Sequence, residues 1–167
     1  PWWMVPSVRV PDLFLTYMNQ DVPRLVGNQA AAAHLNSVHG VTLHEEHRGL
    51  GMDLLPLTML NSVTMLGAEL VGRSYGGGLL KIEPREADRL PMPSPEAVAH
   101  AAERLRELRP QLAKQLRNSQ LSAVAKAVDE VLLEEQLRLG RHEIAILVEA
   151  RRMMEARRSA RAARRRR

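Results

Sequence analysis

The chain has 167 residues, 45% hydrophobic but only 3% aromatic, so it is long enough for one domain with an aliphatic core. The absence of cysteine excludes disulfides, thiolate metal sites and cysteine nucleophiles, and it agrees with a cytoplasmic location. No apolar run approaches the roughly 20 residues that a membrane-spanning helix needs, so we expect no membrane partner.

The net charge of +5 is unevenly distributed along the chain. Residues 151–167 hold nine arginines and one acid, whereas the other 15 basic and 18 acidic residues give the rest of the chain a charge of −3. Such a basic tail is typical of contact with nucleic-acid phosphates. The alternative is a solvated, partly disordered end that keeps the chain soluble.

Short apolar runs separated by polar turns fill the first 43 residues. These runs predict strands within residues 2–10, 12–18, 24–26 and 36–43. Residues 29–35 fit a helical turn or a loop, and 44–51 fit a polar loop closed by two glycines. Several short strands before a helix predict an α+β fold, with a small mixed or antiparallel sheet packed on that helix.

The central stretch 57–93 organises the prediction. Asp53 is a plausible N-cap for a helix over 54–71, and Gly72 stands where a C-terminal glycine cap should fall. The glycines at 76–78 can adopt positive φ or allow close approach of another backbone. After them, 79–83 reads as a strand whose Lys81 faces away from its apolar neighbours.

The glycine turn does not fit a nucleotide cradle, because those sites need strand, glycines, then a helix N-terminus, and here the helix comes first. Its neighbours Arg73, Ser74, Tyr75 and Lys81 suit contact with a polyanion, since arginine binds guanine or phosphate and tyrosine stacks on bases. The alternative is a structural, hairpin-like turn with solvated neighbours.

Residues after Pro93 are predicted to be helical to the end. Ser94, Pro95 and Glu96 form an N-cap, a first-turn proline and an acid at the positive end of the helix dipole. Pro110 is expected to interrupt this first helix. A second amphipathic helix ends at Gly140, and a last one becomes arginine-rich. We therefore divide the chain into residues 1–93, a helical region 94–150 and the tail 151–167.

Other chemistry has weaker support. The histidines at 34, 39, 44 and 47 are close in sequence, but His44 and His47 stand one residue too near for the HExxH zinc pattern, so polar loop residues are the simpler interpretation. No GxSxG pattern indicates a serine nucleophile. Asn61 and Ser62 lie in an apolar helix, where a buried polar pair usually forms helix-packing hydrogen bonds.

Three segments carry a family resemblance: NSVHGV (36–41), LNSVTMLGAELVGRSYGGGLLKIEP (60–84) and LPMP (90–93). Together they resemble the C-terminal target-recognition region of adenine-specific DNA methyltransferases, the TaqI-like enzymes and the fused restriction-modification methylases. The similarity spans roughly residues 8–93. It implies that double-stranded DNA is a partner. The DNA-facing residues it implies are Arg73, Ser74, Tyr75, Gly76, Gly77, Gly78 and Lys81, with Asn36 and His39 as base-edge contacts.

The resemblance also exposes an absence, because methyl transfer in this family needs an (N/D/S)-P-P-(Y/F/W) motif and a cofactor-binding glycine turn. The chain has no Pro-Pro pair. We therefore expect no catalytic or cofactor-binding residues here, and expect S-adenosylmethionine on a separate methyltransferase domain or subunit. Trp2, Trp3 and the apolar N-terminal strands would dock on that partner.

The alternative from a different class is a helical interaction or assembly protein with a basic tail and no DNA specificity. Its support is the acidic body and the amphipathic helices of residues 94–140.

Overall fold

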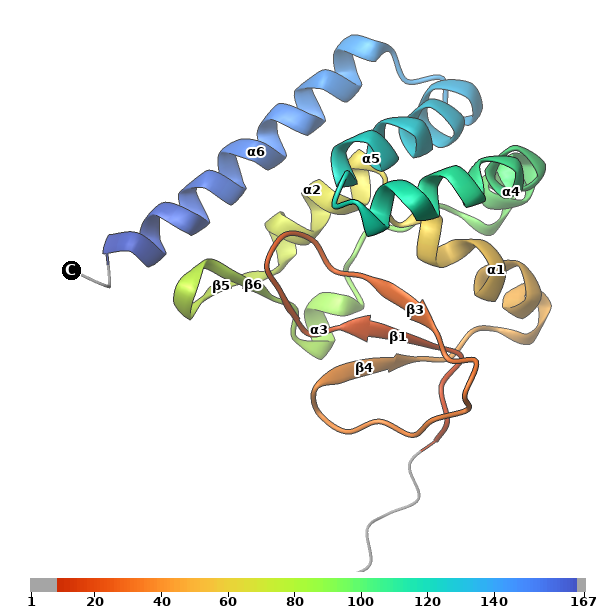
Figure 1. The fold of residues 1–167 in the computed structure, drawn as a ribbon, viewed down its shortest axis with the longest axis horizontal. Helices are drawn as coiled ribbons and strands as arrows, with labels where there is room; N and C mark the ends of the chain where they lie inside the picture. The colour runs from red at the N-terminus through yellow and green to blue at the C-terminus, as the bar shows by residue number, and fades with distance from the viewer. Residues whose placement is uncertain (1–8, 165–167) are drawn as a thin grey trace, which may run out of the picture.

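The computed structural model of the protein describes residues 9–164, a region of small sheets followed by long helices (Figure 1). The strands are β1 Leu13–Thr16, β2 Met18–Asn19, β3 Leu25–Gly27, β4 Val38–Val41, β5 Arg73–Tyr75 and β6 Leu79–Lys81. The helices are α1 Arg48–Thr58, α2 Ser62–Val71, α3 Pro84–Ala87, α4 Pro95–Arg117, α5 Leu121–Asp129 and α6 Arg141–Arg164. Short 3₁₀ turns occupy Glu45–His47 and Gly76–Gly78, and α5 continues as a π-helix over Glu130–Gln136.

The strands form two three-stranded antiparallel sheets, in the orders β3-β1-β4 and β2-β6-β5. Tyr17 links the two sheets along the chain, because it stands between β1 and β2, and its carbonyl accepts a hydrogen bond of 2.9 Å from the Ile82 N–H beside β6. The predicted α+β class with a small antiparallel sheet is therefore confirmed. The strands are shorter than predicted. Residues 48–51, expected as part of a loop, are the first turn of α1. The edge strand predicted within 2–10 lies mostly outside the described residues.

The single helix predicted over 54–71 is wrong, because the chain bends by 81° between α1 and α2. Asn61 makes this joint. Its side-chain oxygen caps α2 by accepting from the Thr64 N–H at 2.9 Å, and its amide nitrogen donates to the Thr58 carbonyl at 2.7 Å. One side chain thus satisfies backbone groups at the end of one helix and the start of the next. Asp53 is not an N-cap, because it lies inside α1.

The start of α4 follows the prediction, whereas its interior does not. Ser94 is the N-cap, accepting from the Ala97 N–H at 3.3 Å, and Pro95 is the first helical residue. Pro110 does not interrupt the helix, which runs on to Arg117. Because Pro110 lies on the exposed face, water can reach the carbonyl whose helical partner the proline removes.

The helices lie in layers over the sheets. In Figure 1, α1 and α2 lie between the strands and the outer helices α4, α5 and α6. Their buried faces form one aliphatic core with the sheet residues, and burial of this apolar surface is the main stabilising contribution. Residues on both sides of position 93 contribute to this core. The predicted boundary between a domain of residues 1–93 and a helical region of residues 94–150 stays a prediction. Fully buried members include Leu13, Leu54, Leu60, Leu80, Ile82, Leu105, Leu112 and Val128.

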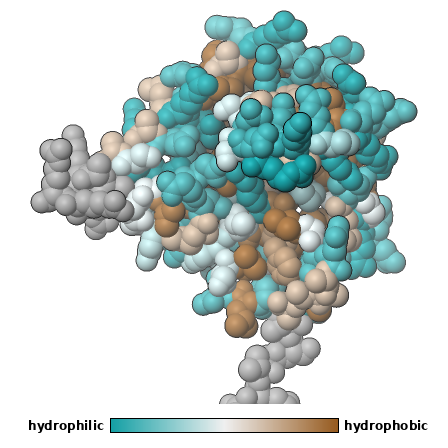
Figure 2. Space-filling model, viewed as in Figure 1, coloured by the Kyte–Doolittle hydropathy of each residue, from teal (hydrophilic) through white to brown (hydrophobic). Residues whose placement is uncertain are grey.

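The arginine-rich end is helical as far as the structure describes it. Residues 151–164 continue α6, which packs against α2 and against the glycine turn. The disordered-end interpretation therefore does not hold for this stretch. The face shown in Figure 2 is mostly hydrophilic, with apolar side chains in small, separate groups.

Among residues 9–164, no single helix is long and apolar enough to cross a membrane. The segments Glu45–Thr58 and Ser62–Val71 meet that test of length and composition only when taken together as a bent pair.

Candidate nucleic-acid interface

The predicted glycine turn is the tip of a β-hairpin formed by β5 and β6. Tyr75 pairs with Leu79 beside the turn, and Arg73 pairs with Lys81 at its base. Gly77 and Gly78 have φ of 78° and 82°, a conformation that favours glycine. Residues 73–75 thus form a strand and are not part of the turn. The local structure is the hairpin-like turn that the sequence offered as an alternative.

Gly72 is the C-cap of α2, as predicted, and its backbone is extended, with φ −75° and ψ 170°. Glycine is needed here for steric reasons, because a Cβ would lie 2.7 Å from the Ala68 carbonyl oxygen and 2.7 Å from a methyl of Leu80. A glycine at this position lets the hairpin leave α2 while β6 packs directly against the helix end.

Arg73 and Lys81 are cross-strand partners, and each pairs with a carboxylate. The Arg73 guanidinium donates to Glu86, and Lys81 Nζ lies 2.6 Å from Glu83 Oε1. The hydrogen bond to Glu86 raises the pKa of Arg73, and the bond to Glu83 raises the pKa of Lys81 while lowering that of Glu83. The Arg73 side chain remains 69% exposed, against 22% for Lys81. Arg73 is therefore the more accessible of the two charges.

Two tyrosine rings lie near the Lys81 ammonium. Its nitrogen lies 5.0 Å from the ring centre of Tyr17 and 5.4 Å from that of Tyr75, within cation–π range. The Tyr17 hydroxyl donates to Glu83 at 3.1 Å. Tyr75 remains 56% exposed, so one aromatic ring is presented to solvent beside the Arg73 guanidinium.

His39 joins this group from β4. Its ring stands edge-on to Tyr17 with 5.2 Å between ring centres, and its Nε2 donates to the Ile82 carbonyl at 2.6 Å. That nitrogen is therefore already engaged. Asn36 is exposed in the turn before β4, and no hydrogen bond within the described residues links it to the hairpin. The structure thus gathers Arg73, Tyr75, Lys81 and His39 but not Asn36.

Several residues of this site were not predicted from the sequence. Glu83 and Glu86 form a capping box around α3, and the spacing of an acid, proline and a second acid three residues later was a usable signal. The sequence signal for Tyr17 was weaker. The side to which a strand residue points depends on the pairing register, which the sequence did not determine.

The largest omission is Arg158 of α6, which is only 4% exposed. It forms a two-bond ion pair with Glu69 of α2, at 3.2 and 2.8 Å. It also donates to the Gly78 carbonyl, and to the Gln20 carbonyl at 3.3 Å. The usable signal was Glu69 itself, a lone acid in an apolar helix that needs a partner when buried.

Comparison with known proteins identifies the family of the chain. The sequence profile of the family described as "Type II methyltransferase M.Eco57I, C-terminal domain" matches residues 1–133. The chain belongs to this family. The type II methyltransferase M.XamI of Xanthomonas campestris pv. amaranthicola is 36% identical over 95 residues, a match that covers 57% of this chain but only 17% of that relative. No solved structure matches the chain significantly.

The family match and this relative confirm the predicted resemblance to the C-terminal region of a restriction-modification methylase. The hairpin lies inside the matched residues, whereas α6 lies beyond them. An element outside the family match thus contacts the turn of the hairpin through Arg158.

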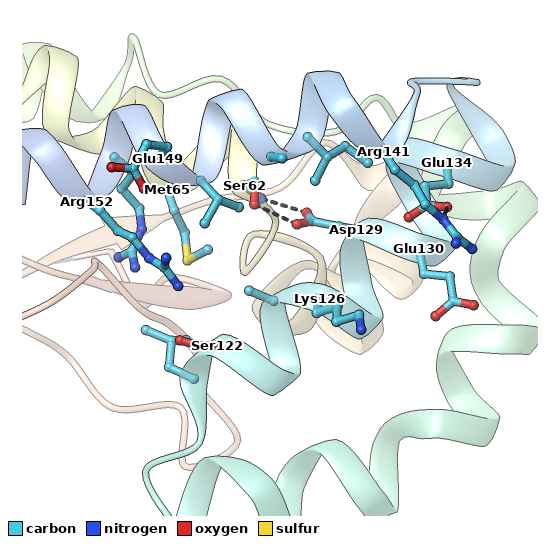
Figure 3. A pocket seen from close by; sticks show the side chains of 16 residues that line it. Ser62, Met65, Ser122, Lys126, Asp129, Glu130, Glu134, Arg141, Glu149 and Arg152 are labelled. Atoms are coloured by element: carbon cyan, nitrogen blue, oxygen red, sulfur yellow. Dashed lines mark hydrogen bonds and ion pairs between the residues drawn. The ribbon is translucent and has the colours of Figure 1, made fainter.

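The domain also has a cavity of about 910 Å³ between α5 and α6 (Figure 3). Met65, Ile144 and Val148 give it an apolar lining, and charges of both signs surround them. Within it, the Asp129 carboxylate accepts from the Ser62 N–H at 2.7 Å and from the Ser62 hydroxyl at 2.6 Å. This contact between α5 and α2 confirms the helix-packing role predicted for Ser62.

The four predicted loop histidines do not come together. Across the described part of the chain, no three His, Asp or Glu side chains are placed to hold a metal ion. His34 stands edge-on to Phe14, and His47 lies 3.4 Å from Glu46.

Proposed function

We propose that this domain is the DNA target-recognition part of an adenine-specific methyltransferase of the restriction-modification or phage-defence type. The observation that carries the proposal is the hairpin, which presents Arg73 and Tyr75 to solvent in a domain of a methyltransferase family. Arginine and an exposed ring beside a glycine turn suit DNA contact, since the backbone can approach closely there.

Each residue has a proposed role. Arg73 contacts phosphate or guanine, exchanging its pairing with Glu86 for the DNA. Tyr75 packs on a sugar or base, while Lys81 supports the ring from behind. Ser74 and the exposed glycines 76 and 77 allow close backbone approach, whereas Gly78 is buried and supports the turn from below. His39 and Asn36 extend the contact along the sheet. Exposed arginines of α6 add phosphate contacts without sequence preference.

Methyl transfer itself is assigned to a separate catalytic domain or subunit, which would hold S-adenosylmethionine and the flipped adenine. The proposed docking residues, Trp2 and Trp3, lie outside the described residues. Sequencing the coding DNA upstream of Pro1 tests this division. A reading frame with a Pro-Pro-Tyr motif supports it, and a neighbouring frame unrelated to methyltransferases counts against it.

The hairpin is tested by measuring duplex binding of the Arg73→Ala and Lys81→Ala variants over a range of salt concentrations, with and without a catalytic partner. We expect Arg73→Ala to weaken binding and to reduce the slope of log K against log salt by about 1, because one phosphate contact is lost. Lys81→Ala should weaken binding mainly by releasing Tyr75.

Arg104→Ala on α4 is the matched control, since Arg104 is exposed and α4 lies away from the β5–β6 hairpin in Figure 1. Binding that is absent or insensitive to salt in every variant would reject the DNA proposal.

A second candidate, assembly through the helices, is favoured by one observation. Ile146 and Met153 stand seven residues apart on α6 and are 55% and 51% exposed, so these two apolar side chains lie on the same side of the helix. Size-exclusion chromatography separates the two functions: a stable oligomer that ignores DNA favours assembly, and a monomer favours the DNA proposal.

A further inference from the structure

Two consecutive arginines of α6 have opposite surroundings. Arg157 is exposed, and no ion pair within the described residues engages it. Arg158, the next residue, is 96% removed from solvent and directs its guanidinium into the protein. Since neighbouring helix positions point about 100° apart, a helix lying on the surface can expose one arginine and bury the next.

The acceptors of Arg158 come from three separate segments. Glu69 belongs to α2, Gly78 ends the glycine turn of the hairpin, and Gln20 follows β2. The guanidinium has five N–H donors in a fixed plane, so one side chain can hold all three segments at set positions. A lysine ammonium, which lacks this planar fork, would not hold the same set.

The turn is the part of the hairpin that most needs such support. Gly77 and Gly78 have backbone freedom that other residues lack, so a free turn of this composition samples several shapes. The carbonyl of Gly78 is held by Arg158 rather than by the hairpin ladder.

We propose that Arg158 is a positioning residue that fixes the glycine turn against α2 and α6. As a consequence, the hairpin and the exposed arginines of α6 present one rigid surface to DNA. The positioning stands on the contacts above, and only its consequence for DNA rests on the proposed function.

The test compares two variants of the 167-residue chain. Glu69→Leu/Arg158→Met replaces the buried ion pair by apolar groups of similar size, a change that often preserves folding, and it deletes the bonds to Gly78 and Gln20. Arg157→Gln removes one charge from the adjacent exposed position and is the matched control. Urea unfolding first establishes that both variants are folded.

Amide hydrogen exchange is the readout that does not depend on DNA. We expect protection of the amides in residues 73–81 to fall about tenfold or more in the Glu69→Leu/Arg158→Met variant, because a charged hydrogen bond to the turn is lost. The amides of α4 and α5 serve as internal reference. Arg157→Gln should leave protection of residues 73–81 unchanged. Unchanged protection in both variants would overturn the proposal.

DNA binding supplies the second readout, with a randomised duplex pool and a single fixed duplex as probes. Arg157→Gln should reduce the salt slope by about 0.9 and keep the sequence preference selected from the pool. Glu69→Leu/Arg158→Met should keep the slope and lose the preference. A double variant that behaves like Arg157→Gln would contradict positioning.

Two further outcomes stay decisive. If the parent chain binds no DNA, the proposed function fails, while hydrogen exchange still decides the role of Arg158. If Glu69→Leu/Arg158→Met does not fold, Arg158→Lys replaces it, because it keeps the charge beside Glu69 but not the fork. The same loss of protection, in smaller degree, is then expected, and its absence overturns the proposal.

Discussion

Asp129 shows how a single buried carboxylate contributes to the pH response of the fold. It is 3% exposed and accepts two hydrogen bonds from Ser62. Burial raises the pKa of Asp129 above its ordinary value, although the bonds from Ser62 oppose the rise. The folded chain therefore holds this proton at a pH where the unfolded chain has released it, so the free energy of unfolding falls as pH rises through that window.

We expect Asp129→Asn to gain stability relative to the parent as pH rises from about 4 to about 7, because asparagine carries no buried charge. Its amide can still accept from the Ser62 N–H and donate to the hydroxyl. Urea unfolding at both pH values measures the difference. Asp88→Asn, at an exposed position, controls for the loss of one negative charge. A gain that is equal at the two pH values would show that burial is not the cause.

Among single residues, the sequence indicated some of the buried polar side chains but not their partners. Ser62 and Asn61 were recognisable, because polar side chains inside an apolar run need partners. Their partners were not recognisable, since Asp129 lies 67 residues from Ser62, and Arg158 lies 89 residues from Glu69. Local patterns carry no information on contacts at such separations.

Among the elements, the hairpin depends on glycine at only some of its three positions. Gly77 has φ of 78°, whereas Gly76 has ordinary φ and open space where a Cβ would be. The run of three glycines therefore contains two positions with positive φ, Gly77 and Gly78, and one, Gly76, that does not need glycine for backbone shape.

We expect Gly77→Ala to lower the free energy of unfolding by about 1 kcal/mol, since a Cβ is strained in the left-handed region. Gly76→Ala should be neutral or slightly stabilising, because it restricts the unfolded chain without strain in the folded one. Thermal unfolding of the two variants measures both effects. Equal destabilisation by both changes would show that crowding, and not positive φ, decides.

The element predictions failed where a side chain overrode the local pattern. Residues 54–71 are mostly leucine, methionine, valine and alanine, yet Asn61 ends one helix and starts another. Likewise Pro110 has the character of a helix breaker, but its exposed position leaves the freed carbonyl to water. In both cases the outcome depends on the tertiary surroundings of one residue.

For the whole molecule, two aspartates tie the layers together. Asp12, before β1, accepts from the Leu43 N–H and from Arg48 of α1. Asp53 of α1 accepts from Arg106 and Arg109 of α4. These hydrogen bonds lower the pKa of both carboxyls. Their contribution is therefore present above the unfolded pKa near 3.9 and is lost as pH falls through the lower folded pKa.

We expect the parent to lose stability below about pH 4, and Asp53→Asn to lose less over that range because its contact no longer titrates. At neutral pH the same change should lower the free energy of unfolding by at most about 1 kcal/mol, since Asp53 is partly exposed. Acid titration followed by circular dichroism measures both, with Glu107→Gln, from an exposed pair, as control. Parallel acid curves for the parent and Asp53→Asn would contradict this role.

The bond from Arg158 to the hairpin also bears on the engineering of hybrid methylases. A designer guided by sequence similarity would exchange this region at residue 133, where the family match ends. Such a graft would carry the hairpin and Glu69 but leave behind the helix that holds them. The transplanted turn would then lack the guanidinium that binds the Gly78 carbonyl, and Glu69 would lack its ionic partner. A transferable unit therefore includes residues 134–158, although similarity alone would discard them.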